Sequence, residues 1–332
     1  MLLMTSTFSS APVDVAAIGA GSLEVHRREL TGYCYRMLGG RSEAEDAVQE
    51  TMLRAWRSID GFEGRSSVRS WLYRIAHHVC IDMHRSPQRR ARPMDLGPST
   101  ATADVVLGDR VGEARWLQPV ADQHVIDTSA DPADVAAARE SIRLAFVAAL
   151  QHLPAKQRSV LILCEVLKWQ AAEAAELHDT SVASVNSALQ RARATLDSLD
   201  AEQLDAVVDP AHEALLARYV DAFERYDIDT LVTLLRDDAV LSMPPFDLWL
   251  QGASDLAAWF LGQGIGCKGG RLVPVNVNGT AGFGNYRCTG AGRWEPFAIQ
   301  VIEVAGGRIV GHHNFLYPEW FDAFGLPPRL ED

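Results

Sequence analysis

The sequence lacks the cysteine patterns and the long apolar runs that mark several large classes of protein. Its five cysteines are scattered, and none has a CxxC or Cys/His ligand spacing, so we expect reduced thiols, with no disulfide framework, metal site or cofactor. Residues 1–22 are rich in Ser, Ala and Gly and have neither a basic start nor an apolar run long enough for a signal or a span. This composition predicts a disordered tail and a cytoplasmic protein without a membrane partner.

Positive charge is scarce overall but concentrated near the N-terminus. The formal net charge of -12 argues against a free-standing nucleic-acid binder. Residues 23–92, however, carry 13 arginines against 9 acidic side chains, whereas residues 200–332 carry 9 basic against 19 acidic ones. This asymmetry predicts that the two ends attract each other or meet different partners. A length of 332 residues is enough for two or three domains, each with its own core.

Apolar residues at helical spacing predict a first all-α unit. Gly39-Gly40 ends its first helix, and Ser42 with Glu45 has the pattern of a capping box that starts the second. The loop at residues 60–67 separates the second helix from the third. The three predicted helices span residues 23–38, 42–59 and 68–85.

The outward side of the second predicted helix carries one leucine among polar residues. Such a leucine is either a stray exposed residue or the centre of a docking surface for a large partner. We call these residues the docking set: Asp46, Gln49, Glu50, Leu53 and Arg57.

The third predicted helix and the loop before it gather basic, aromatic and small hydroxyl side chains. Arginines interleaved with aromatic rings suit a strand of unpaired nucleic acid, whose phosphates need cations and whose bases need stacking surfaces. The plainer interpretation is a solvated basic face. The residues concerned are Arg65, Ser66, Ser67, Arg69, Trp71, Arg74, His77 and His78.

Residues 86–138 contain Pro, Gly, Ser, Thr and Asp throughout and show little periodicity. A structureless stretch of this length is too long for the inside of a compact domain, so it predicts a linker between domains. Its part from 104 to 134 carries 7 acidic side chains against 2 arginines. Trp116-Leu-Gln-Pro119 is an apolar island that either docks on a neighbouring surface or is incidental.

A second helical unit over 140–199 has two helices around a tight turn at His178-Asp-Thr180, the sequence pattern of a helix-turn-helix. Similar pairs are common in bundles that bind no DNA. The unit is electrically neutral, so it should bind duplex weakly unless something else holds it in place. The side chains that would read DNA are Ser184, Asn186, Ser187, Gln190, Arg191 and Arg193.

These motifs resemble the extracytoplasmic-function (ECF) sigma factors of bacterial RNA polymerase. The stretch 44–56 is similar to that family's polymerase-docking helix, and 70–76 to the start of its promoter -10 helix. The stretches 153–158 and 185–193 are similar to its -35-reading domain. The resemblance implies two partners, core RNA polymerase through its β′ and β subunits and promoter DNA.

The resemblance also implies roles for the residues. The docking set would face the coiled coil of β′, and the loop at 61–69 would hold a flipped -10 base. We therefore name the eight residues from Arg65 to His78 the -10 set, and the six from Ser184 to Arg193 the -35 set. The acidic linker would thread through polymerase channels. His77-His78 depart from the family's usual basic or polar residue followed by Asn, so the preferred -10 sequence stays open.

From Pro210 onwards, helices followed by strands predict an α+β cone with a curved antiparallel sheet. Residues 243–252 and the helices before them resemble the SnoaL-like domain appended to some ECF sigma factors, including the sigma-G type. The resemblance implies a cone that often encloses a pocket and, in some members, isomerase, cyclase or hydrolase activity. Predicted helices span 211–226, 228–235 and 253–261, and predicted strands span 239–243, 271–278, 282–288, 297–304 and 308–316.

We expect Trp249, Asn278 and His313 in the cone pocket. The sequence shows no matched carboxylates, triad spacing or metal-ligand set, so we predict no catalytic residues. The cone would then bind a small ligand or pack against the helical domains. A competing hypothesis is an enzyme in the cone with the helical domains as a targeting arm, and a third is an ordinary helix-turn-helix regulator.

The sequence as a whole thus predicts a sigma factor that binds core polymerase, recognises and melts promoters, and is modulated by its own C-terminal domain. The fold is multidomain, with two all-α domains followed by an α+β cone. We expect a disordered tail (1–22), a first helical domain (23–92), an acidic linker (93–138), a helix-turn-helix domain (139–199), a short linker (200–210) and the SnoaL-like domain (211–332).

Overall fold

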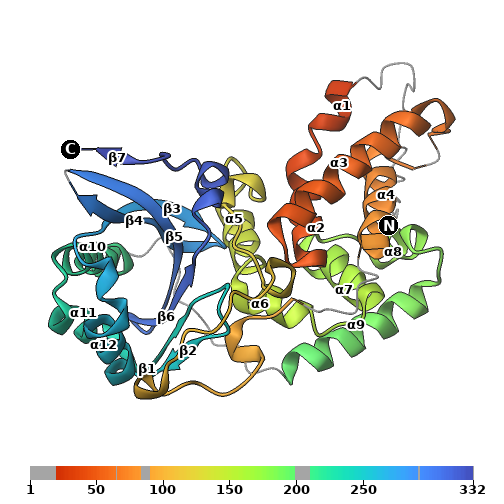
Figure 1. The fold of residues 1–332 in the computed structure, drawn as a ribbon. Helices are drawn as coiled ribbons and strands as arrows, with labels where there is room; N and C mark the ends of the chain where they lie inside the picture. The colour runs from red at the N-terminus through yellow and green to blue at the C-terminus, as the bar shows by residue number, and fades with distance from the viewer. Residues whose placement is uncertain (1–19, 65, 84–89, 199–209, 291, 332) are drawn as a thin grey trace.

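The computed structural model of the chain describes residues 20–64, 66–83, 90–198, 210–290 and 292–331. Figure 1 shows a helical lobe beside a lobe built on a sheet, with the long linker running between them. Residues 20–22, expected in a disordered tail, begin helix α1 (Ala20–Glu24). The rest of that tail and nearly all of the short linker expected over 200–210 lie outside the described residues.

The first helical unit has the three longer helices that the periodicity predicts. Gly39 ends the first of them in the left-handed conformation, with φ of 71°. The predicted capping box is wrong, because the Ser42 hydroxyl donates to Oε1 of Gln118 in the linker, 3.1 Å away, and caps nothing. The helices are α2 (Arg27–Leu38), α3 (Arg41–Ser58) and α4 (Val68–Met83).

The second helical unit begins earlier than predicted, inside the expected linker. Asp131 starts its first helix, because the side chain accepts a hydrogen bond from the Ala133 N–H and Pro132 occupies the first helical position. A π-helical turn, Ile162–Val166, extends α7. The helices are α5 (Pro132–Glu140), α6 (Leu144–Leu150), α7 (Ala155–Leu161), α8 (Ala171–Leu177) and α9 (Val182–Asp197).

The two helical units share one hydrophobic core, although the sequence predicts a separate core for each domain. Leu30 and Tyr33 of α2 belong to the same buried cluster as Val160 of α7 and Trp169, which precedes α8. Full burial of such a side chain contributes roughly 1.5–3 kcal/mol. The shared core therefore holds the two units together as one lobe.

The linker is ordered, although its composition predicts no regular structure. Ala91 pairs with Trp116 in a short parallel bridge, which brings the start of the linker back to the apolar island. Within that island Trp116, Leu117 and Gln118 are at most 1% exposed. The island is docked, and the interpretation of an incidental aromatic is wrong.

The C-terminal domain is an α+β cone whose sheet has the strand order β2-β1-β6-β5-β4-β3, with β7 beside β5. β1 and β6 run parallel, so the sheet is mixed, and its other described pairings are antiparallel. The helices are α10 (Pro210–Arg225), α11 (Ile228–Leu234) and α12 (Ala253–Leu261). The strands are β1 (Leu235–Ser242), β2 (Trp249–Gln251), β3 (Arg271–Val277), β4 (Thr280–Gly290), β5 (Arg293–Ala305), β6 (Arg308–Phe315) and β7 (Leu330–Glu331).

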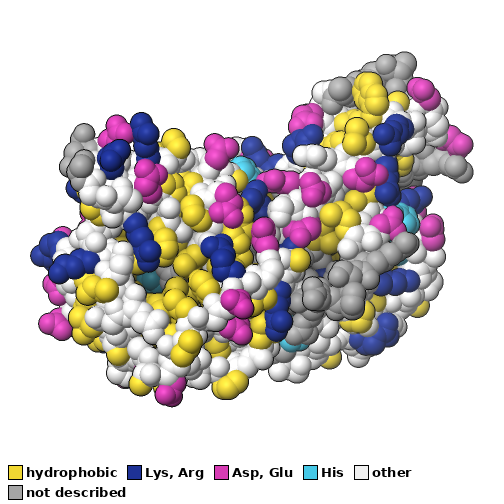
Figure 2. Space-filling view, viewed as in Figure 1, with side chains coloured by type: hydrophobic (Ala, Val, Ile, Leu, Met, Phe, Trp, Pro, Cys, Tyr) yellow, Lys and Arg dark blue, Asp and Glu magenta, His cyan; other side chains and the backbone are white. Residues whose placement is uncertain are grey.

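Both faces of this sheet are buried. One face packs under α10, α11 and α12, and the other forms a cluster that also contains Ala121 of the linker and Leu144 of α6. Figure 2 shows acidic and basic side chains interspersed on both lobes. On the face of the molecule that Figure 2 shows, the charge asymmetry of the sequence does not appear as two separate patches.

Candidate functional site

The docking set lies on the outward face of α3, as predicted. Four of its five members are exposed, among them Leu53, which is 50% exposed. Glu50 is half-buried and accepts a hydrogen bond from Arg54 Nε at 2.7 Å. Trp56, which the sequence analysis did not single out, is 55% exposed. Its spacing of three residues from Leu53 is the signal that could have found it.

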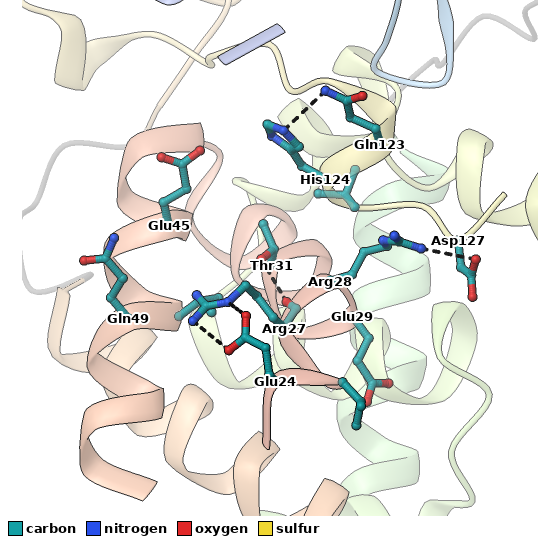
Figure 3. Close-up of a pocket in the computed structure, with 13 residues that line it drawn as sticks. Glu24, Arg27, Arg28, Glu29, Thr31, Glu45, Gln49, Gln123, His124 and Asp127 are labelled. Carbon is teal, nitrogen blue, oxygen red and sulfur yellow. Dashed lines mark hydrogen bonds and ion pairs between the residues drawn. The ribbon is translucent and has the colours of Figure 1, made fainter. Parts of the chain in front are cut away.

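A groove of about 850 Å³ runs beside the docking set, between α2, α3 and the linker. Figure 3 shows Gln49 on one side of it and, on the other, Arg28 paired with Asp127 at 3.2 Å. Arg27 is paired as well, with Glu24 at 3.0 Å. The groove therefore extends the docking face without adding a free positive charge.

The -10 set lies on α4 and the loop before it but does not form one free surface. Arg65 lies outside the described residues. Of the others, only Ser67 and His78 are exposed. Trp71 is half-buried and its ring lies 4.9 Å from that of Phe62. Most of this set is therefore engaged within the protein.

The second helical unit covers the -10 set. The guanidinium of Arg69 lies 5.3 Å from the centroid of the Trp169 ring, and Arg74 donates from Nη2 to the Glu176 carbonyl of α8 at 3.1 Å. A cavity of about 200 Å³ lies between these parts, lined by Ser66 and Ser67 on one side and by α8 on the other. This contact could not be predicted from the sequence, because its partners are about 100 residues apart.

A cluster of histidines marks the centre of that contact. The His77 ring lies 4.5 Å from the ring of His178 at the end of α8. The Tyr33 hydroxyl is 3.2 Å from His77 Nδ1 and 2.8 Å from the hydroxyl of Ser159, which is 3.1 Å from His178 Nε2. Burial, and then the nearby positive charges, lower the pKa of His77 to about 3 and of His178 to about 4. Both rings are therefore neutral at pH 7.

The -35 set, in contrast, faces outwards. Five of its six members are exposed along α9, and Ser184 is half-buried. Ser181 caps this helix by accepting a hydrogen bond from the Ser184 N–H at 3.2 Å. Arg193 pairs with Glu165, while Gln190 and Arg191 remain on the open face. The helix-turn-helix thus presents its reading helix while the -10 set is covered.

The turn between β3 and β4 joins the C-terminal domain to both helical units, and we call Asn278-Gly279 the latch. Asn278 Nδ2 donates to the Tyr35 hydroxyl of α2 and to the Ile142 carbonyl before α6, both at 2.7 Å. Val120 of the linker donates to Asn278 Oδ1 at 2.9 Å and accepts from its backbone N–H at 3.0 Å. Asn278 is therefore fully buried at the junction of the domains, and the prediction that it lines the cone pocket is wrong.

Gly279 completes the latch because it has no side chain. Its φ is 68°, and a Cβ there would lie 2.3 Å from the Arg139 carbonyl oxygen. Its N–H donates to Asp122 Oδ1 at 2.8 Å. Burial raises the pKa of Asp122 to about 6, against the smaller opposing effects of this hydrogen bond and of Arg139.

Acidification from about pH 7 to pH 5 is expected to loosen the contact between α4 and α8. His77 has a lowered pKa in the closed form, so the contact loses stability as pH falls below the ordinary histidine pKa of about 6.5. For this 8% exposed side chain the loss is about 1–2 kcal/mol at pH 5. Asp122 acts in the opposite direction. Because its pKa is raised in the folded protein, its protonation at low pH stabilises the closed form.

Fluorescence of Trp169, which packs on Arg69, would follow this opening. The matched variant is His77→Gln, which keeps Asp122 but removes one titrating ring. Its pH profile should be flatter than that of the wild type. Superimposable profiles would count against this role of His77.

The cone encloses a cavity of about 210 Å³, and its polar end is built around His312. His312 Nε2 is 2.7 Å from the Tyr219 hydroxyl, which is 2.9 Å from Gln300 Oε1. Asn314 Nδ2 is 2.9 Å from His312 Nδ1. Burial, and then the charge of His313, lower the pKa of His312 to about 3, so this end of the cavity is uncharged at neutral pH.

None of the three residues predicted for the cone pocket is among those that line this cavity. Trp249 lies on β2, where its Nε1 donates to the Gly97 carbonyl at 2.9 Å. His313 points to the opposite face of the sheet, because neighbouring residues of a strand alternate and His312 faces the cavity. The prediction of His313 for the cavity is therefore wrong, and its neighbour His312 lines the cavity in its place.

On that opposite face, Ser242, His313 and Glu303 form a hydrogen-bonded trio that the sequence analysis missed. His313 Nδ1 is 2.9 Å from the Ser242 hydroxyl, and its Nε2 is 3.2 Å from Glu303 Oε2. Burial alone raises the pKa of Glu303, but the charge and hydrogen bond of His313 lower it overall. The residue types are those of a hydrolase triad. All three are nevertheless at most 8% exposed, and none lines the cone cavity.

The cysteines show no pattern of metal or disulfide chemistry. All five belong to the described chain and are unpaired, with Cys34 and Cys80 buried and Cys288 exposed. Within the described ranges, no group of three or more His, Cys, Asp or Glu side chains is placed to hold a metal. Nor does any helix in those ranges have the length and apolar character that crossing a membrane requires.

Three family models match the chain, in an order that agrees with this geometry. Sigma-70 region 2 matches residues 23–90, Sigma-70 region 4 matches 143–196, and the SnoaL-like domain matches 216–312. They correspond to the unit with the docking face, the helix-turn-helix unit and the cone. The class so defined is the sigma factor, the subunit that directs RNA polymerase to promoters, here with an appended domain.

Two curated relatives extend over almost the whole chain. ECF RNA polymerase sigma factor SigG of Mycobacterium tuberculosis is 43% identical over 312 residues, which is 92% of this chain and 83% of that protein. SigJ of the same organism is 27% identical over 319 residues, or 92% of this chain and 94% of that protein. The chain belongs to the ECF family of RNA polymerase sigma factors.

The fold agrees with that membership. The crystal structure of M. tuberculosis SigJ superimposes with a TM-score of 0.60 and 24% identity, covering 93% of this chain and 100% of that one. Sigma regions 2 and 4 imply RNA polymerase and promoter DNA as partners. The protein is thus a promoter-directing sigma factor with a SnoaL-like C-terminal domain, and sigma factors generally act by binding and not as enzymes.

Proposed function

We propose that the docking set binds the β′ coiled coil of core polymerase, that the -10 set binds and opens promoter DNA, and that the -35 set reads the upstream element. The corresponding domains are those expected at 23–92, 139–199 and 211–332, with α5 extending the second of them into the linker expected over 93–138, and a short linker at 200–210. The exposed Leu53 and the outward -35 set support these roles. Because its partners are polymerase and DNA, the protein acts in the cytoplasm.

We further propose that the free protein is closed and that its C-terminal domain stabilises this arrangement. The observation that carries the proposal is the latch, where Asn278 bonds to both helical units and the linker while α8 covers the -10 set. The docking set remains exposed in this arrangement. Polymerase can therefore bind the closed protein first, and exposure of the -10 set follows.

The experiment that tests this regulation removes residues 205–332 and compares in vitro transcription with that of the full chain. Loss of the latch should release the -10 set, so the truncated protein should form open complexes faster at equal core polymerase. Comparison at several salt concentrations controls for the loss of acidic charge. Equal rates at every salt concentration would refute the regulatory role.

Leu53→Ala combined with Asp46→Ala is expected to weaken binding to core polymerase by about tenfold or more, because truncation of a central anchor at an interface commonly costs about 2 kcal/mol or more. Both side chains are exposed, so the free energy of unfolding should stay unchanged. Leu261→Ala with Asp229→Ala, which alters an exposed leucine and an exposed acid of the cone, is the matched control. Wild-type affinity in a titration of labelled protein with core would contradict the role of the docking set.

We also propose that the cone acts by binding and not by turnover. Its described lining residues include no carboxylate, and a histidine with a pKa near 3 is a poor base at neutral pH. The trio around His313 is buried outside the cavity. The alternative of an enzyme with a helical targeting arm is therefore not favoured by any observation on the described site residues.

A further inference from the structure

We propose that the cone cavity binds a small apolar carboxylate, which pairs with Arg287 and lies under a lid formed by linker residues 105–111. The inference goes beyond the roles proposed above and holds whether or not the closed arrangement regulates transcription. It rests on three features of the cavity: one cation without an ion-pair partner among the described residues, an apolar wall and a strap of linker across the mouth.

Arg287 brings to the cavity wall a positive charge that has no ion-pair partner among the described residues, although Glu295 stands opposite it on β5. Its guanidinium carbon lies 3.5 Å from the centroid of the Phe297 ring, and its Nε is buried without a hydrogen-bond partner. No carboxylate of the described chain forms an ion pair with it. A partly buried guanidinium in this position favours an anion, and its planar fork matches a carboxylate.

The rest of the cavity selects for a small apolar body. Its volume of about 210 Å³ is below the ~300–1,000 Å³ of sites for drug-sized ligands. This volume indicates a ligand with a single ring or a short chain. An amine would find no counter-charge, because the described lining residues include neither Asp nor Glu. The apolar wall consists mainly of Phe223, Leu241, Met243, Phe246, Trp259 and Phe260.

The linker crosses the mouth of this cavity at Leu107. Leu107 lines the cavity and is still 44% exposed, so it lies at the boundary with solvent. Hydrogen bonds fix the strap on either side of it, from Gln263 Nε2 to the Val105 carbonyl and from the Val111 N–H to the Pro245 carbonyl, both 2.9 Å. Figure 1 shows the linker passing beside β1 in this region. A ligand that enters past Leu107 would displace this side chain and thereby the linker between the sigma domains.

Calorimetric titration of the full chain with benzoate and hexanoate tests the proposal, with benzamide and hexanamide as uncharged counterparts. The carboxylates should bind at least about tenfold more tightly than the amides, and Arg287→Met should weaken carboxylate binding about tenfold to a hundredfold. Arg271→Met is the control, because Arg271 lies over the Trp294 ring in the same domain and does not line the cavity. If Arg287→Met does not fold, Arg287→Lys, which keeps the charge but loses the fork, should bind about tenfold more weakly.

No binding of either carboxylate, equal binding of acids and amides, or wild-type affinity in both Arg287 variants would overturn the inference. The lid has its own readout in hydrogen exchange at the Val111 amide, which should accelerate when benzoate is bound. Leu107→Ala should raise the association rate of benzoate several-fold. Unchanged exchange together with an unchanged association rate would remove the lid from the proposal.

Discussion

Replacing Asn278 by glycine is expected to release the C-terminal domain from both helical units, and thereby to loosen the contact between these two units, while each unit stays folded. Asn278 has φ of 52°, a conformation that glycine adopts freely, so the change removes only the side chain. The Ile142 carbonyl and the Val120 N–H lose their partner in a buried place, whereas the Tyr35 hydroxyl still donates to the Gln118 carbonyl. At about 1–3 kcal/mol for each of these two unsatisfied groups, the closed arrangement should lose about 2–6 kcal/mol.

A loss of that size raises the ratio of open to closed protein by about thirtyfold or more. Hydrogen exchange at the Val120 amide would report the opening directly, and open-complex formation with core polymerase should be faster for the variant. Asn276→Ala is the matched control, because Asn276 is an exposed asparagine on the same hairpin. If the two variants exchange and transcribe alike, the latch does not hold the domains together.

Arg158→Met is expected to cause the largest loss of stability in the helical lobe. Arg158 is 1% exposed, and it donates from Nη1 to Gln151 Oε1 at 2.7 Å and from Nη2 to the Leu153 carbonyl at 3.1 Å. It also donates to the Met37 carbonyl at the end of α2, which ties region 4 to region 2. Methionine fills similar space but leaves these buried acceptors unpaired. We expect the free energy of unfolding to fall by about 3–5 kcal/mol.

Denaturation in urea, followed by fluorescence, measures this loss. Arg158→Lys keeps the charge but cannot reach all the acceptors at once, so its stability should lie between those of the wild type and the methionine variant. The α2–α7 contact is the one most affected, so unfolding of the variant should lose cooperativity between the two helical units. A methionine variant as stable as the wild type would show that the unit–unit contact depends on apolar packing alone.

The features that the sequence predicted well are those set by local spacing. The core side of α3 follows from a period of 3.6 residues, which places the buried Ala44, Val48, Thr51 and Ala55 on one face of the helix. The exposed Leu53 was detectable for the same reason, since an apolar residue on a charged helix face is visible without tertiary information. The end of α2 at Gly39 depends on one backbone conformation, and it was also predicted correctly.

The features that the sequence could not predict depend on contacts between distant segments. Asn278 and Tyr35 are 243 residues apart, and an Asn-Gly pair between two strands indicates only a hairpin turn. Gln118 takes the Ser42 hydroxyl that was expected to cap α3. His77 stands in a helix that reads as nucleic-acid binding, yet it is buried against His178. In each case a local pattern was outweighed by a tertiary partner that the pattern does not identify.

The distance between regions 2 and 4 tests the central claim most directly. Spin labels carried by unnatural amino acids at Ser58 and Ser198, both exposed, leave the five cysteines unchanged. Pulsed electron paramagnetic resonance should give a single distance between the two labels in the free protein and a longer distance in its complex with core polymerase. The Asn278→Gly variant should show both distances before polymerase is added. The same single distance in the free protein, the complex and the variant would contradict the account.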